Sequence, residues 1–152
     1  MAADFNTVMD YLRRICSARE YASKDILQKA LARLESPDEA AGALETLQRE
    51  GYQSDLRYAS AFCRDKSAIA GWGPYKIRYQ LSSKGISKEI IDTAMGEIDS
   101  DKAVERLRRA LSVKREQLRD DPQLKLKLLK FGLSRGYSYE EVQSCLDSQR
   151  ER

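Results

Sequence analysis

The chain has 152 residues, of which 41% are hydrophobic and 34% are charged, and its formal net charge is +3. It contains no histidine, which excludes a Ser-His-Asp triad, a Cys-His pair and a His-ligated zinc site. Its three cysteines form no CxxC motif and no apolar run approaches the ~20 residues of a membrane span, so we expect a cytoplasmic protein with no metal centre and no membrane segment.

Along the chain, three segments align without gaps at a period of 51 residues, beginning at Ser36, Ser87 and Ser138. Their apolar positions recur at the i, i+3, i+4 spacing of one helix face. The positions in register are Ala40/Ile91/Val142, Ala43/Ala94/Cys145 and Leu44/Met95/Leu146. Each serine lies where a helix N-cap belongs, and Gly85 and Gly136 lie where a preceding helix would end.

Two further helices are predicted ahead of each aligned segment. A short one begins near Ser23, near Pro74 and after Asp121-Pro122, and a longer amphipathic one covers residues 5–15, 56–62 and 104–111. No segment alternates at period two, so we expect an all-α protein of about nine helices. They would form three tandem three-helix repeats (residues 1–53, 54–100 and 101–152) in an elongated, curved array, with start signals at Ser54 and at Asp99/Ser100.

Positive charge is concentrated in the last repeat. Residues 1–52 carry a net charge of −2, residues 53–101 carry 0 and residues 102–152 carry +5. Arg106 and Arg109 share a helix face with Lys102, and Lys127 and Lys130 lie along the next predicted helix. Three interpretations stay open for this basic stripe: a solvated face, a phosphate-binding surface, or a groove for a partner protein.

Residues 71–88 contain four cations and no acid, with Trp72, Tyr75 and Tyr79 interleaved. Aromatic rings with cations can stack on bases and contact phosphates. Alternatively, Trp72 fills the joint between two helices and the cations form a solvated face. The glycines here lack the Lys-Ser/Thr of a P-loop, so a nucleotide site is disfavoured.

The remaining candidate groups favour a structural interpretation. Asp120-Asp121 stands beside Pro122, where a helix cap and a first-turn acid belong, rather than forming a metal-binding pair. The cysteines fall on apolar faces as small buried hydrophobes rather than as nucleophiles. We therefore expect a protein that is not an enzyme and holds no cofactor.

One motif is specific to a known family. Residues 51–62 read Gly-Tyr-Gln-Ser-Asp-Leu-Arg-Tyr-Ala-Ser-Ala-Phe, and residues 71–86 read Gly-Trp-Gly-Pro-Tyr-Lys-Ile-Arg-Tyr-Gln-Leu-Ser-Ser-Lys-Gly-Ile. This pattern resembles the middle repeat of the RecX family, bacterial regulators of the RecA recombinase. Arg19-Glu20-Tyr21 and residues 135–142 resemble landmarks of its first and last repeats, so the resemblance spans about residues 8–148.

The resemblance implies a modulator that binds the RecA nucleoprotein filament on single-stranded DNA, with duplex DNA as a further ligand, and that suppresses ATP hydrolysis, strand exchange and coprotease activity in recombination, repair and the SOS response. The candidate contact residues are Arg57, Arg64, Trp72, Lys76, Arg78, Lys84, Arg106, Arg109, Lys127 and Lys130. For Arg57, a structural ion pair with an acid is the alternative. We expect a monomer, and the rival function is a general helical DNA-binding protein that makes no specific recombinase contact.

Overall fold

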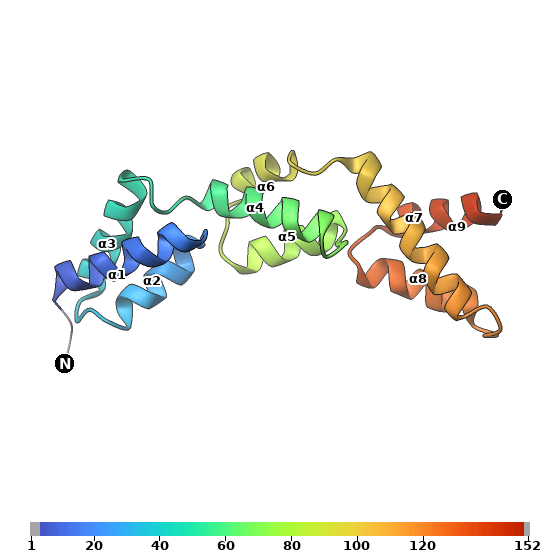
Figure 1. The fold of residues 1–152 in the computed structure, drawn as a ribbon, viewed down its shortest axis with the longest axis horizontal. Helices are drawn as coiled ribbons and strands as arrows, with labels where there is room; N and C mark the ends of the chain where they lie inside the picture. Colours follow the sequence, from blue (N-terminus) through green and yellow to red (C-terminus); the bar gives the residue numbers. More distant parts are fainter. Residues whose placement is uncertain (1–3, 151–152) are drawn as a thin grey trace. The chain divides into compact units, whose positions relative to one another are not determined.

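The computed structural model describes residues 4–150, and this part of the chain contains nine α-helices and no β-strand (Figure 1). The helices are α1 (Phe5–Ala18), α2 (Ser23–Leu31), α3 (Pro37–Arg49), α4 (Asp55–Ala68), α5 (Pro74–Ser83), α6 (Lys88–Met95), α7 (Ser100–Gln117), α8 (Leu124–Ser134) and α9 (Tyr139–Arg150). The predicted all-α fold is confirmed.

The predicted capping residues begin their helices. The Ser36 hydroxyl accepts hydrogen bonds from the amides of Asp38 and Glu39, and the Ser87 hydroxyl accepts one from the Ile90 amide. Ser138 forms a complete capping box, because its hydroxyl accepts from the Glu141 amide while the Glu141 carboxylate accepts from the Ser138 amide. These side chains satisfy first-turn amides that the helix itself leaves unpaired.

Glycines with positive φ close the short helices. Gly85 has a φ of 79° and Gly136 a φ of 96°, the left-handed conformation that a glycine adopts without steric cost. The following amides return to the helix, from Ile86 to the Leu81 carbonyl and from Tyr137 to the Gly132 carbonyl. This is the six-to-one bond of a Schellman motif.

The chain forms two compact units. Unit 1 comprises the chain up to Ala61 together with Leu81–Ala94, and unit 2 comprises Phe62–Gln80 together with the chain from Met95 onward. In unit 1, helix α3 packs against α1 and α2 around a core that includes Leu12, Ile26 and Leu47. The repeat boundaries that we expected after residues 53 and 100 stay predictions.

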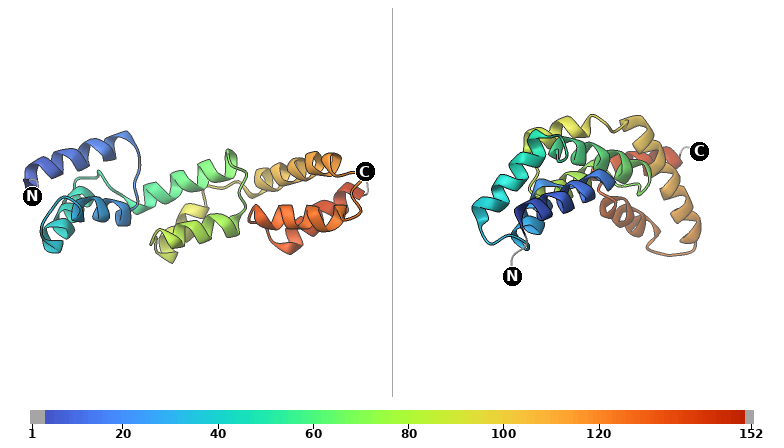
Figure 2. Two further views of the ribbon diagram at one scale, coloured as in Figure 1. Left: turned by 90° about the horizontal axis from the view of Figure 1, so that it is seen from below. Right: turned by 60° about the vertical axis from the view of Figure 1, so that its left-hand side comes forward.

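In unit 2, helices α7, α8 and α9 pack against one another (Figures 1 and 2). Their core includes Leu107, Leu111 and Leu128, and the buried Tyr137 hydroxyl donates to the Ala103 carbonyl at 3.1 Å. Two of the three aligned positions are buried in every segment: Ala40, Ile91 and Val142, and Ala43, Ala94 and Cys145. At the third position Leu146 is buried, whereas Leu44 and Met95 are half-buried.

Candidate nucleic-acid and partner interface

The segment from Gly71 to Pro74 is docked on the end of helix α8 within unit 2. The Gly73 amide donates to the Arg135 carbonyl at 2.6 Å, and the Tyr75 amide donates to the Gly136 carbonyl at 3.0 Å. The Trp72 amide donates to the Lys66 carbonyl at 2.8 Å. Because protein carbonyls already take these amides, the glycine-rich segment is a backbone joint and not a phosphate cradle.

Trp72 fills this joint, as one of the two interpretations predicted. Its half-buried indole meets the Phe62 ring edge-to-face, with centroids 6.0 Å apart. The ammonium groups of Lys66 and Lys76 lie 4.8 and 4.4 Å from the indole centroid. The Lys76 ammonium also approaches the Ser134 carbonyl at 3.5 Å, so both Trp72 and Lys76 have structural contacts.

Two other aromatic side chains of this region face solvent. Tyr75 is 62% exposed and Tyr79 is 69% exposed, one turn apart on α5, and Arg78 between them is half-buried. Residues four apart lie on the same helix face. The aromatic surface that the sequence predicted is therefore made by the two tyrosines, while Trp72 belongs to the joint.

Four of the predicted cations, Lys127 among them, are engaged in ion pairs. The Arg57 Nε atom lies 3.1 Å from the Glu20 carboxylate, and its Nη2 donates to the Gly51 carbonyl at 2.8 Å, so the structural alternative for Arg57 is realised. Lys84 pairs with Asp25 at 3.2 Å and Arg64 with Glu97 at 3.4 Å. Exposed pairs of this kind are worth only about 0–1 kcal/mol, so these cations can exchange partners cheaply.

The basic stripe of the third repeat is divided between exposed and engaged side chains. Arg109 on α7 and Lys130 on α8 are exposed. Arg106 is half-buried and its Nε atom has no hydrogen-bond partner among the described residues. Lys127 pairs with Asp121, which lowers the pKa of that carboxyl, and Asp121 also accepts from the Gln123 amide at 2.8 Å. The N-cap residue of α8 is Gln123 and the first turn of this helix contains no acid, so the predicted role of Asp120-Asp121 as helix cap and first-turn acid was wrong. Asp121 instead stabilises the turn that precedes the helix.

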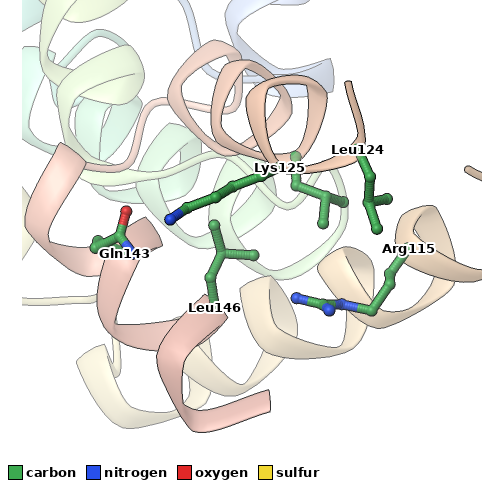
Figure 3. A pocket seen from close by; sticks show the side chains of 6 residues that line it. Arg115, Leu124, Lys125, Gln143 and Leu146 are labelled. Atoms are coloured by element: carbon green, nitrogen blue, oxygen red, sulfur yellow. The ribbon is translucent and has the colours of Figure 1, made fainter. Parts of the chain in front are cut away.

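A hollow among α7, α8 and α9 has a volume of about 90 Å³ and is shown in Figure 3. Leu124, Leu128 and Leu146 form its apolar wall, and Arg115, Lys125 and Gln143 bring polar groups to it. Small-molecule sites usually measure about 300–1,000 Å³, so this hollow is too small for such a ligand.

Within residues 4–150 no group of three or more acidic or cysteine side chains is placed to hold a metal ion, and no helix is long and apolar enough to cross a membrane.

A second basic surface was not predicted from the sequence. It lies in unit 1, where Arg19, Lys29, Arg33 and Lys84 line an open hollow together with Tyr21. The net charge of −2 over residues 1–52 concealed it, because a segment total does not report how charges are distributed in space. Only Lys84 was among the candidate residues.

The three cysteines are buried thiols, as predicted. Burial raises the pKa of Cys16 and Cys145, and it raises the pKa of Cys63 to about 11 against the opposing charge of Arg78. Thiolate is the nucleophilic form of cysteine, so these environments disfavour nucleophilic chemistry.

We expect the native protein to resist alkylation at all three cysteines at pH 8. With a pKa of about 11, Cys63 has roughly 0.1% thiolate at that pH, against about a quarter for an unperturbed thiol of pKa ~8.5. Thiol titration with a disulfide reagent should therefore be at least about a hundredfold slower in buffer than in denaturant. A fast-reacting thiol in the native protein would contradict the buried placement.

Comparisons of the sequence and of the fold with known proteins all find RecX proteins. A sequence model of the second three-helix domain of RecX matches residues 54–95. The regulatory protein RecX of Chromohalobacter salexigens is 31% identical over 148 residues, covering 96% of this chain and 95% of that protein. That of Actinobacillus pleuropneumoniae is 30% identical over 141 residues, covering 93% and 91%. A crystal structure of RecX from Lactobacillus salivarius superposes with a TM-score of 0.84 at 19% identity, covering 97% of each chain.

Proposed function

The chain belongs to the RecX family of regulatory proteins, and from this premise we propose that it inhibits the RecA recombinase by binding the filament that RecA forms on single-stranded DNA. The observation that carries the proposal is sequence identity along almost the whole chain, from the first repeat to the last. In this proposal the protein acts by binding, as a cytoplasmic monomer, and suppresses ATP hydrolysis, strand exchange and coprotease activity in repair and the SOS response.

The accessible groups of unit 2 support a binding role. Arg109 and Lys130 are exposed cations, and Tyr75 and Tyr79 are exposed aromatic side chains. Cations contribute to binding of a phosphate backbone through counterion release, and aromatic rings stack on unpaired bases. We propose these four residues as primary contacts, with Arg64, Arg78, Arg106 and Lys127 as secondary contacts.

The first experiment titrates RecA's single-stranded-DNA-dependent ATP hydrolysis with this protein. We expect half-inhibition well below one protein per RecA, because a bound regulator acts on a filament and not on one subunit. Inhibition that required stoichiometric protein, or no inhibition at all, would contradict the proposal. Intact, salt-sensitive binding to bare DNA without inhibition would establish the rival general DNA-binding function instead.

Charge reversal then locates the contact. Arg109→Glu/Lys130→Glu should raise the concentration for half-inhibition by roughly tenfold or more, since both attractions become repulsions. A matched control is Arg49→Glu/Lys88→Glu, which changes the same charge at two exposed positions in unit 1. Equal loss in both variants would show a general charge effect and remove Arg109 and Lys130 from the interface.

A further inference from the structure

The basic hollow of unit 1 is an open cavity of about 470 Å³. The end of α1 contributes Arg19, helix α2 contributes Asp25 and Lys29, and Arg33 and Lys84 follow the ends of α2 and α5. Four cations and one carboxylate line it, so the net charge of its lining is +3. Among the described residues, Asp25 is the only acid in this lining. Such a concentration of one sign raises the local concentration of anions.

Lys84 pairs with Asp25, and the other three cations are held in place by groups that leave their charge intact. The Arg19 guanidinium lies 4.4 Å from the Tyr21 ring centroid, and the Lys29 ammonium lies 5.7 Å from the same centroid. The Arg33 guanidinium lies 4.1 Å from the Tyr11 centroid and donates to the Lys29 carbonyl at 3.1 Å. Rings and carbonyls orient these side chains without neutralising them, which preorganises the hollow for an anion.

Apart from Asp25, several acids of this unit are engaged away from the hollow. Glu50, at the end of α3, forms a bidentate pair with Arg13 at 3.0 Å, which lowers the pKa of the Glu50 carboxyl. Glu20 pairs with Arg57, and Asp38 and Glu39 occupy the first turn of α3. The net charge of −2 in residues 1–52 therefore coexists with a strongly positive surface at the hollow.

We infer that this hollow binds the phosphodiester backbone of a nucleic-acid strand. Guanidinium groups present two parallel N–H donors that match phosphate oxygens, and lysine ammonium groups add compact positive charge. The hollow is open, so a continuous strand can pass through it, whereas a closed cavity would select a small ligand. The inference rests on the proposed function and assigns it a second contact surface, built from Arg19, Lys29 and Arg33.

The test uses the full chain, a labelled single-stranded oligothymidine and a salt titration. Each phosphate contact to a single strand contributes about 0.7 to the slope of log affinity against log salt. Arg19→Gln/Lys29→Gln should therefore reduce the slope by about 1.4 and weaken binding at 0.1 M salt by roughly 25-fold. The control Arg49→Gln/Lys88→Gln removes the same charge outside the hollow and should retain the wild-type slope.

A gain-of-binding variant separates ligand contact from structural damage. Asp25→Asn removes the acid that pairs with Lys84 and should raise the slope by about 0.7 and the affinity by roughly fivefold. Loss of structure cannot produce tighter binding, so this direction is diagnostic. Unchanged or weaker binding by Asp25→Asn would count against the hollow.

Three outcomes overturn the inference, and each differs from failure of the proposed function. If Arg19→Gln/Lys29→Gln and its control had equal slopes of log affinity against log salt, DNA would not bind in the hollow, even though the wild type still inhibited RecA. If this variant kept its DNA affinity but lost RecA inhibition, the hollow would bind an acidic protein surface instead. Micromolar binding of inorganic triphosphate, lost in the same variant, would assign it to a small phosphorylated ligand. Failure of the proposed function itself would appear as wild-type protein that does not inhibit RecA.

Discussion

Gly73→Ala is expected to destabilise unit 2 by about 3 kcal/mol or more. An added Cβ at Gly73 would lie 2.4 Å from the Gly136 carbonyl oxygen and 2.7 Å from the Tyr137 amide nitrogen. Both neighbours are backbone atoms, so no side chain can rotate to relieve the overlap. The substitution must separate the joint and break the hydrogen bonds from Gly73 and Tyr75 to the end of α8, which puts it among the largest effects of single substitutions.

Urea denaturation followed by tryptophan fluorescence measures this effect locally, because Trp72 is the single tryptophan of the chain and lies in the joint. Far-ultraviolet circular dichroism follows the two glycine controls, which lie in unit 1 and have no tryptophan nearby. Gly42→Ala is the matched control, since nothing lies within 4 Å of its added Cβ in the middle of α3, and it should gain up to about 1 kcal/mol in helix propensity. Gly51→Ala, with a φ of 84° and open space, should cost about 1 kcal/mol from backbone strain alone. A Gly73→Ala protein as stable as Gly51→Ala would contradict the close-packed joint.

Asp55→Ala is expected to destabilise unit 1 by about 3 kcal/mol. The Asp55 carboxylate accepts hydrogen bonds from the Ser23 amide at 2.8 Å, the Ser23 hydroxyl at 2.9 Å and the Gln53 side-chain amide at 3.0 Å. Gln53 is 3% exposed and also donates to the Tyr21 carbonyl at 3.0 Å. Removing the acceptor leaves three donors unsatisfied in a part-buried network, and hydrogen bonds to a charged acceptor are worth about 1.5–3 kcal/mol each.

Far-ultraviolet circular dichroism during urea denaturation measures this loss, because unit 1 has no tryptophan. The control is Asp65→Ala, which removes an exposed carboxylate from the same helix and should change stability by less than about 0.5 kcal/mol. Asp55→Asn should lie between the two, since an amide oxygen still accepts but carries no charge. Equal stabilities for the Asp55→Ala and Asp65→Ala proteins would show that the network around Ser23 contributes little.

The sequence alone determined the helices, the serine caps and glycine ends of the aligned segments, and two of the buried positions that these segments share. Ser36, Ser87 and Ser138 act on amides within three residues, and Gly85 and Gly136 act on the turn that ends their own helix. Such interactions are local, so residue type and spacing suffice to predict them. The buried register of the three repeats followed for the same reason, because the spacing of apolar residues fixes which face of a helix turns inward.

Only the tertiary structure decided which candidate side chains are already paired within the protein. Arg57 is paired with Glu20, 37 residues away, and Lys84 with Asp25, 59 residues away, and nothing in the spacing of either residue indicates its partner. The sequence favoured neither of two roles for Trp72, filling a joint between helices or stacking on bases. The hydrogen bonds of the Gly71–Pro74 segment to the end of α8 place Trp72 in the joint.

The basic hollow of unit 1 shows the same limit most clearly. Three of its cations come from residues 19–33, within a stretch whose total charge is negative, and the fourth is Lys84, from a stretch with no net charge. Long-range packing brings those cations together and pairs acids such as Glu20 and Glu50 with other partners, whereas composition records only their sum. Local chemistry therefore fixed the elements of this protein, and the contacts between distant segments fixed its surfaces.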